Sequence, residues 1–470
     1  MLALSLVDSG LVLARRCGDA RAIAAEAPGI ALLEEDATLT GEQAARRMRL
    51  KPLLAHSNYW RTLGVEPLAR PSRLVRTTAD IAYAQAQALL RPFKSEGEEG
   101  EQVLLAVPAG YTREQLSLLL GIINETGVPA AGLVDAGLAA CSLEPAPARV
   151  LHLELELQHA TLTVLEHSGA AQGGGLKRNR YEIALRHGVL ALQQTWMQFI
   201  AEQFVRKTRF DPLHEAAAEQ RMFDQLPQWL RELQDADRIT PSMQFGERAL
   251  EIEIERAQFV AAVDKHYGEL VRLVQAARIA GMPIELRLSD RAAVLPGLLE
   301  RLRALRDCTI QVLQPGAAAL GALQYEAAIR RPSDALALVH QLPTPRAAAT
   351  RDSMQVASTP APLRPTHVLF QGRAWRLSEQ PLVVGWAVEP GRRSLPLPNA
   401  APGVSRSHCT LVRRDGAVIL EDHSTYGSYI NDERVFGRTV LTVGDRLRLG
   451  APGVTLEMIQ LVNDDGAPQD

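Results

Sequence analysis

The stretch that decides the fold of the C-terminal part reads Val404-Ser405-Arg406-Ser407-His408 and then, fourteen residues after His408, Asp422-His423-Ser424-Thr425-Tyr426-Gly427-Ser428-Tyr429-Ile430-Asn431. Residues 409–412 and 417–420, between these polar segments, are short and rich in β-branched side chains, which predicts two strands. Asp415-Gly416 between them is typical of a hairpin turn. A β-sandwich presents such polar loops at one end of a rigid scaffold. We therefore expect these loops to bind a ligand.

The C-terminal pattern resembles the forkhead-associated (FHA) domain, a reader of phosphothreonine peptides. The resemblance runs from about Thr366 to Val462. It rests on motifs that follow one another in the family's order: Leu382-Val383-Val384-Gly385, the Ser-Arg-x-His run, the Asp-x-Ser-x-x-Gly run, Asn431, and Leu441-Thr442-Val443-Gly444-Asp445. The resemblance implies an all-β FHA sandwich over residues 366–463, followed by a tail at 464–470.

The same resemblance implies roles for individual loop residues. Ser405 is expected to donate its hydroxyl to the phosphate, and Thr425 lies where the second loop also reaches it. Four residues are expected to be structural, as loop braces and turn residues: Gly385, His408, Gly427 and Asn431.

Two positions depart from the family's pattern. Trp386 follows Gly385 where the family has an arginine that grips the phosphate, and Tyr426 precedes Gly427 where the family has an asparagine. A lost charge-assisted contact costs about 1.5–3 kcal/mol. Arg406 could replace the missing charge, as could Arg392 or Arg393; alternatively, Trp386 and Tyr426 form an aromatic lip for an unmodified protein surface. The candidate binding residues are Ser405, Arg406, Thr425, Tyr426 and Trp386.

Composition limits the class of protein. The chain has 470 residues, 46% hydrophobic and 22% charged, as expected for a multidomain globular protein. The net charge of -3 provides no overall attraction to nucleic acid or anionic membrane. The four cysteines lie far apart without metal-site spacing, which favours a reducing cytoplasm. No apolar run approaches the length of a membrane span.

Residues 1–330 alternate predicted strands and helices. Residues 151–157 alternate apolar and polar side chains and are predicted to pair with residues 161–165 as a hairpin. Thr112-Arg113-Glu114-Gln115 is a capping box that predicts a helix extending to Thr126. Residues 292–305 are predicted to form a single helix. Interleaved strands and helices with antiparallel hairpins favour a two-lobed α/β domain.

This region is similar to the nucleotide-binding part of the seventy-kilodalton heat-shock chaperones, in the actin-like ATPase superfamily. The similarity rests on patches in the family's order: Gly41-Glu42-Gln43-Ala44-Ala45, Leu104-Leu105-Ala106-Val107-Pro108-Ala109, residues 121–127, residues 255–259, and residues 317–322. It implies an actin-like (ribonuclease-H-like) fold over residues 1–330.

The phosphate-binding hairpins of that superfamily are altered. Asp8 and Gly10 remain in the first hairpin, but Leu11 and Val12 replace threonine hydroxyls. The second hairpin reads Glu156-Leu157-Gln158-His159-Ala160-Thr161 where the family has Asp-Leu-Gly-Gly-Gly-Thr. Because only glycine lets backbone N–H groups approach phosphates so closely, we expect a pseudo-ATPase rather than an enzyme. The degenerate nucleotide residues are Asp8, Gly10, Glu156 and Thr161; binding of ATP and Mg²⁺ without hydrolysis stays open.

His152, Glu154 and Glu156 fall on one face of a predicted strand. They could be metal ligands, but alternation with leucines favours a solvated strand face. Residues 331–365, rich in proline, alanine, threonine and serine, are predicted to be an extended linker.

We therefore expect a non-enzymatic adaptor or scaffold without a cofactor, which binds a protein partner, by the resemblance a phosphothreonine-containing one, in bacterial signalling or complex assembly. The alternative is an ATP-binding, chaperone-like protein that switches with nucleotide.

Overall fold

A computed structural model gives the fold. It describes residues 1–94, 100–168, 174–279, 282–332, 336–347, 364–387, 391–398, 403–414, 416–431, 433–435, 437–450 and 453–461. The chain divides into two compact units, the first comprising Met1–Val271 with Glu285–Ala348 and the second Arg272–Ile284 with Ala349–Asp470.

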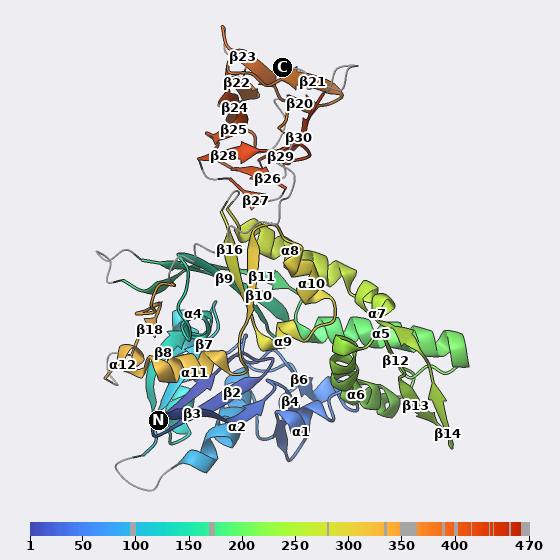
Figure 1. Ribbon diagram of the computed structural model, residues 1–470. Coiled ribbons are helices and arrows are strands. Elements are labelled where there is room, and N and C mark those ends of the chain that lie inside the picture. The colour runs from blue at the N-terminus through green and yellow to red at the C-terminus, as the bar shows by residue number, and fades with distance from the viewer. Residues whose placement is uncertain are drawn as a thin grey trace. The chain divides into compact units, whose positions relative to one another are not determined.

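Two six-stranded sheets form the centre of the first unit (Figure 1). The first sheet contains, in spatial order, β18 (Leu338–Val339), β8 (Ala130–Asp135), β7 (Val103–Val107), β1 (Leu2–Ser5), β2 (Leu11–Cys17) and β3 (Ala20–Ala27). Strands β1 to β3 are antiparallel neighbours, whereas β7 runs parallel to β1 and β8 parallel to β7.

The second sheet repeats the order of five of these strands, and its sixth strand lies at the opposite edge. It contains β17 (Cys308–Val312), β16 (Ile284–Leu288), β9 (Arg149–Leu155), β10 (His159–His167), β11 (Leu176–Leu185) and β19 (Gln341–Leu342). Strands β9 to β11 are antiparallel, and β16 runs parallel to β9. Each sheet thus places three antiparallel strands beside two later strands, so the first unit contains one strand arrangement twice.

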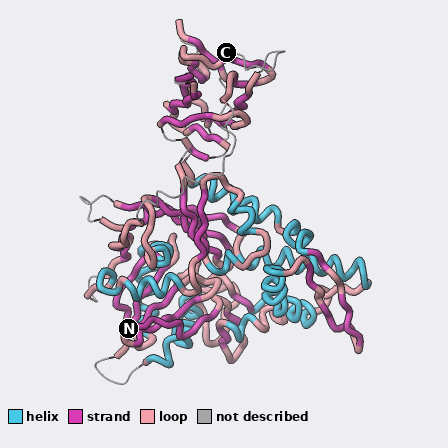
Figure 2. Tube along the Cα trace, viewed as in Figure 1, coloured by secondary structure: helices cyan, strands magenta, loops and turns pink. Residues whose placement is uncertain are grey.

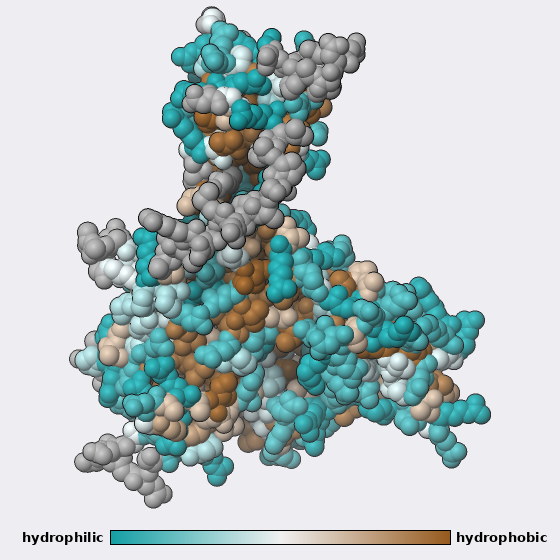
Figure 3. Space-filling view, in the orientation of Figure 1, coloured by the Kyte–Doolittle hydropathy of each residue, from teal (hydrophilic) through white to brown (hydrophobic). Residues whose placement is uncertain are grey.

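The first sheet is buried on both faces. Leu2 and Leu4 of β1 belong to one core cluster, while Ala3 between them belongs to another. This explains why β1 and β7 read as continuous apolar runs rather than alternating ones. Figure 3 shows hydrophobic residues at the surface around β10 and β11 on the face drawn, and hydrophilic ones over helices α5 to α8.

The helices of the first unit include α1 (Glu42–Ala45), α2 (Thr78–Leu90), α3 (Arg113–Glu125), α4 (Ala136–Cys141), α5 (Val189–Thr208), α6 (Ala216–Asp235), α7 (Arg256–Ala262), α9 (Asp290–Ala293), α10 (Leu298–Arg303), α11 (Ala317–Gln324) and α12 (Glu326–Ile329), while α8 (Asp264–Ala277) crosses the division between the units. The capping box before α3 is confirmed: the Thr112 hydroxyl accepts from Gln115 N at 3.2 Å, and Gln115 Oε1 accepts from Thr112 N at 3.0 Å. The single helix predicted for 292–305 is wrong. It divides into α9 and α10 because Pro296 lacks an N–H and Gly297 has φ 82°.

Smaller sheets complete this unit. They are β5 (Thr38–Thr40), β4 (Ala31–Leu33) and β6 (Ala55–His56); β12 (Arg238–Ile239) with β15 (Ile254–Glu255); and β13 (Ser242–Phe245) with β14 (Arg248–Glu251). Helices α5 and α6 and the β13–β14 hairpin gather at one side of the unit (Figure 1).

Part of the expected linker belongs to the sheets. Strand β18 pairs in parallel with β8, and β19 pairs antiparallel with β11, so residues 338–342 join an edge of each sheet. Leu342 is fully buried in the core. The prediction of an extended linker over 331–365 is therefore wrong for residues 338–342, because their apolar side chains and unpaired backbone complete two sheet edges. Residues 348–363 lie outside the described part of the chain.

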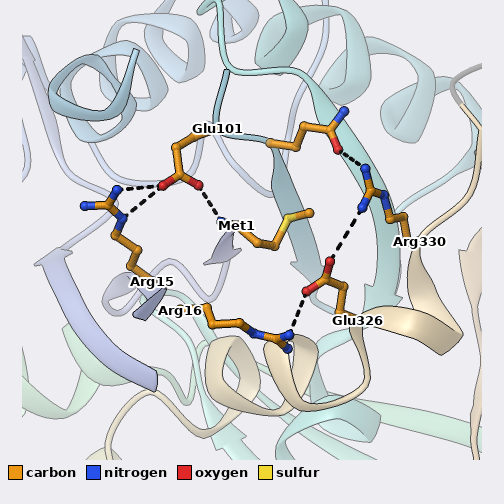
Figure 4. A network of polar contacts seen from close by, with 7 residues as sticks. Met1, Arg15, Arg16, Glu101, Glu326 and Arg330 are labelled. Carbon is orange, nitrogen blue, oxygen red and sulfur yellow. Dashed lines mark hydrogen bonds and ion pairs between the residues drawn. The ribbon is translucent and has the colours of Figure 1, made fainter. Parts of the chain in front are cut away.

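A polar network ties strand β2 to its surroundings (Figure 4). Glu101 accepts from the Arg15 guanidinium at 2.7 Å and from the Met1 amino group at 2.5 Å. Glu326 pairs with Arg16 at 3.3 Å and with Arg330 at 3.7 Å. The pairs link β2 to the residues before β7 and to α12.

The described residues 364–461 of the second unit form strands and loops only (Figure 2). One sheet contains β21 (Arg373–Arg376), β20 (His367–Phe370), β30 (Val454–Ile459), β29 (Arg446–Leu449), β26 (Ser428–Ile430) and β27 (Glu433–Arg434); the other contains β23 (Arg393–Pro396), β22 (Leu382–Gly385), β24 (Cys409–Arg414), β25 (Ala417–Asp422) and β28 (Arg438–Leu441). Side chains from both sheets share one core, which is the predicted sandwich arrangement. The tail expected at 464–470 lies outside the described residues.

Candidate functional site

Three loops of the sandwich converge at one end of the sheet that contains β22, β24 and β25. They are the loop after β22, the loop before β24 and the loop after β25. Trp386 N donates to the Ser405 carbonyl at 3.4 Å. The Ser405 hydroxyl oxygen accepts from Thr425 N at 3.3 Å. The structure thus brings together Trp386, Ser405 and Thr425, which the sequence places up to 39 residues apart.

His408 braces these loops from inside the domain. Its side chain is fully buried; Nδ1 accepts from Ser405 N at 3.0 Å, and Nε2 lies 3.2 Å from the Gly427 carbonyl. A carbonyl only accepts, so Nε2 carries the proton and donates it, which makes the imidazole neutral. Burial lowers the pKa of His408, which favours this neutral form, although the Gly427 bond and the Asp422 charge oppose the shift.

Two glycines permit the close approach of the loops. A Cβ at Gly385 would lie 2.1 Å from the Arg406 carbonyl oxygen, so any side chain there would push the Ser405 loop away. Gly427 has φ 87°, a left-handed conformation that favours glycine. Its N–H donates to the Ser424 hydroxyl at 2.8 Å.

Arg406 supplies positive charge at these loops. Its guanidinium lies 5.2 Å from the centre of the Trp386 ring, within the range of a cation–π contact. Arg406 is exposed and Trp386 is partly buried against the core. Arg393 does not fill this role, since its guanidinium donates to Ser378 at 2.7 Å and to the Arg376 carbonyl at 2.7 Å.

Tyr426 and Asn431 lie differently from one another. Tyr426 is 61% exposed at the tip of its loop, so its ring is available to a ligand. Asn431 has φ 49° and bonds through its side chain to Asp445 at 2.8 Å and to Arg446 N at 2.9 Å. Asn431 therefore holds the turn after β26, on the far side of that strand from Gly427.

The sequence-based prediction did not single out Asp422. Its Oδ1 accepts from the Ser428 hydroxyl at 2.8 Å and from Ser424 N at 3.3 Å, so it shapes the loop that carries Thr425. The signal was present in the Asp-x-Ser spacing, which is typical of a turn closed by an aspartate side chain.

In the first unit, the turns of hairpins β1–β2 and β9–β10 bring two buried carboxylates together. Asp8 is 2% exposed and Glu156 is 5% exposed. Asp8 Oδ1 accepts from Leu157 N at 2.7 Å, and Glu156 accepts from the Thr161 hydroxyl at 2.7 Å and faces His159 Nε2 at 3.2 Å. Burial, and then the Glu156 charge, raise the pKa of Asp8 to about 7.

The surroundings of Gly10 are already occupied. Its carbonyl accepts from the Arg291 guanidinium at 2.9 Å, and a Cβ on Gly10 would lie 2.3 Å from that guanidinium. Of the four predicted nucleotide residues, Asp8, Glu156 and Thr161 lie together, while Gly10 packs against Arg291 and Glu26.

Backbone carbonyls of the β9–β10 hairpin accept hydrogen bonds from the first N–H groups of α5. The carbonyls of Glu156 and Leu157 accept from Val189 N at 2.9 Å and Leu190 N at 3.0 Å. The first N–H groups of a helix are the ones that commonly bind phosphate. Here the protein's own backbone satisfies them.

The strand face that carries His152 is not solvated, contrary to the prediction. His152 is 3% exposed and Glu156 is 5% exposed, because both sides of β9 are covered. Burial, together with the Arg287 charge, lowers the pKa of His152 to about 4. Among the described residues, no group of three or more His, Cys, Asp or Glu side chains is arranged to hold a metal ion.

Comparison with known proteins identifies the C-terminal fold. A family model described as FHA domain matches residues 388–450. No curated protein matches the chain. Within the described residues, none of the helices is both long and apolar enough to cross a membrane.

Proposed function

We propose that this protein is a non-enzymatic adaptor whose FHA domain, at residues 388–450, binds a phosphothreonine-containing partner protein. The observation that carries the proposal is the convergence of the Ser405 hydroxyl, Thr425 N and the exposed Arg406 guanidinium at one set of loops. A phosphothreonine carries nearly two negative charges and three acceptor oxygens. The Ser405 hydroxyl, whose oxygen accepts from Thr425 N, has its proton to donate, and the Arg406 guanidinium supplies further donors and the charge that the phosphate needs.

The position of Arg406 supports phosphate recognition despite Trp386. The family's arginine is missing, but the Trp386 ring that replaces it stacks under Arg406. Stacking leaves the edge of a guanidinium able to donate hydrogen bonds. The Ser405 hydroxyl accepts from Thr425 N, so its own proton can be donated to a phosphate oxygen.

For the first unit we propose an actin-like fold that does not hydrolyse ATP. The strand arrangement that occurs twice, in β1–β3 with β7 and β8 and in β9–β11 with β16 and β17, supports the fold. Arg291 beside Gly10, and the donors of α5 used by the second hairpin, support the loss of phosphate binding.

We further propose that the protein acts in signalling or complex assembly in the cytoplasm of a bacterium. No disulfide joins its four cysteines in the described part of the chain, as is usual in a reducing compartment. The net charge of -3 gives no reason to expect a nucleic-acid partner.

Titration of the full chain with a phosphothreonine peptide library and its unphosphorylated counterpart tests the adaptor. We expect binding only to the phosphorylated library, weakened about tenfold or more in Ser405→Ala and Arg406→Ala. Arg414→Ala is the matched control, since Arg414 is an exposed arginine at the other end of β24.

Equal affinity for both libraries would contradict phosphate reading and favour docking of an unmodified surface on Trp386 and Tyr426. A pull-down from phosphatase-treated and untreated lysate, with wild type and Ser405→Ala, then separates the two modes. Capture of the partner that persists after phosphatase treatment and in Ser405→Ala excludes a phosphate-dependent partner.

A further inference from the structure

A cavity of about 500 Å³ opens beside the carboxylate pair of the first unit. Asp8 comes from the first hairpin, and Glu156 and His159 come from the second. Arg61 and the aromatic side chains of Tyr111 and Tyr181 line other parts of its wall. The cavity therefore combines charges of both signs with aromatic surface.

Three polar groups in this wall have no partner within the described part of the chain. His159 Nδ1 is buried without a hydrogen bond, on a side chain that is 2% exposed. Asp8 uses Oδ1 to accept from Leu157 N, while no hydrogen bond reaches Oδ2. No hydrogen bond or ion pair engages the Arg61 guanidinium, whose charge is nevertheless close enough to lower the pKa of Asp8.

The contacts of the neighbours define what each group needs. When His159 is neutral, Nε2 donates to Glu156 at 3.2 Å, so the lone pair of the buried Nδ1 is left without a donor among the described residues. Asp8 Oδ2 is also an acceptor, and both atoms therefore require a donor. Arg61 requires an acceptor, best a carboxylate, which it can bind with two hydrogen bonds.

The charge balance disfavours a polyanion. The carboxylates Asp8 and Glu156 outnumber the single guanidinium of Arg61, so a free nucleotide phosphate chain would meet net negative charge. We propose that this cavity binds a small zwitterion, with a primary ammonium held by Asp8 and His159, a carboxylate held by Arg61, and an apolar spacer against the tyrosines.

Binding of this ligand depends on pH. The pKa of Asp8 is raised to about 7 by burial and by Glu156, while His159 and Arg61 oppose the rise. Tyr59 and Tyr111 also face Asp8; burial, then its charge, raises the pKa of both, so they stay neutral. The ammonium prefers the ionised Asp8, and affinity increases between pH 6 and pH 8.

Calorimetry on the full chain tests the proposal with ω-amino acids as probes: glycine, 4-aminobutyrate and 6-aminohexanoate. Each probe is compared with the alkylammonium ion and the carboxylate of the same chain length. We expect at least one ω-amino acid to bind, with both single-charge analogues weaker by about tenfold or more. Equal binding by an analogue, or no binding by any probe, overturns the proposal.

Three variants identify the site. Asp8→Asn keeps the bond to Leu157 N but loses the charge. It should weaken binding of the amino acid about tenfold or more and remove the pH dependence of its affinity. Arg61→Gln should remove the preference for the amino acid over its alkylammonium analogue. Asp224→Asn, at an exposed aspartate outside the cavity, is the control and should bind as wild type.

Binding that is unchanged in Asp8→Asn and Arg61→Gln overturns the proposal. Competition by Mg²⁺-ATP that binds the site more tightly than the amino acid also overturns the proposal. Phosphopeptide binding by the FHA domain is measured separately, so failure here leaves that function unaffected.

Discussion

A single residue, Trp386, changes how the FHA loops acquire their positive charge. The tryptophan removes the family's arginine, yet its ring lies 5.2 Å below the Arg406 guanidinium. Trp386 thus replaces one arginine of the family's pattern and contacts another, Arg406. The sequence shows both residues but cannot show that they stack, because Gly385 first has to let the two loops meet.

Trp386→Ala should therefore weaken phosphopeptide binding about two- to fivefold, since an exposed cation–π contact contributes about 0.5–1 kcal/mol. Fluorescence anisotropy with a phosphorylated peptide measures the change. Trp375→Ala is the control, because Trp375 stacks with Arg373 at 5.7 Å on another strand of the domain. A similar loss in both variants would indicate general destabilisation instead.

His152 makes the first unit sensitive to acid. Its pKa is about 4 in the folded chain, compared with the ordinary 6.5, so the unfolded chain binds the proton more readily. The stability is complete above about pH 6.5 and is lost as the pH falls toward 4. Between pH 7 and pH 5 the loss attributable to His152 is about 2 kcal/mol.

His152→Leu should remove that part of the acid sensitivity in urea unfolding at the two pH values. It should cost little at pH 7, because both ring nitrogens of His152 are buried and have no hydrogen-bond partner within the described part of the chain. The exposed His214, changed to leucine, is the control. If His152→Leu shows the same pH dependence as wild type, the buried histidine is not its source.

At the scale of elements, residues 338–342 have the clearest structural effect. Strands β18 and β19 complete an edge in each large sheet, and Leu342 of β19 is fully buried in the core. These strands could not be predicted from the sequence, because each has only two residues and so gives almost no periodic pattern, and because the surrounding segment is rich in proline. Here the edges of two existing sheets offer the unpaired backbone groups with which these short strands pair.

Leu342→Ala should lower the free energy of unfolding of the first unit by about 2–5 kcal/mol, as for a large side chain deleted from a core. Chemical denaturation followed by circular dichroism measures it. Leu53→Ala should change little, since Leu53 is 68% exposed. Equal effects of the two substitutions would mean that the segment does not support the sheets.

At the scale of the whole molecule, the central question is whether the first unit turns over ATP. We expect no magnesium-dependent hydrolysis above that of the Asp8→Ala variant, because Arg291 fills the space at Gly10 and the second hairpin occupies the donors of α5. A phosphate-release assay on both proteins measures it. ATP hydrolysis by the wild type that is lost in Asp8→Ala would contradict this prediction and show that the first unit is an ATPase.

The sequence by itself determined the FHA domain and the mixed α/β character of the first unit. Motifs such as Ser-Arg-x-His and the capping box at Thr112 act over a few residues, where local geometry follows directly from residue type. The tertiary structure decided which side chains meet. It stacked Arg406 on Trp386, buried His152 on a face predicted to be solvated, and left His159 Nδ1 and the Arg61 guanidinium, on two residues that line one cavity, without a partner among the described residues. Burial and charge pairing depend on residues far apart in the chain, so no local pattern contains them.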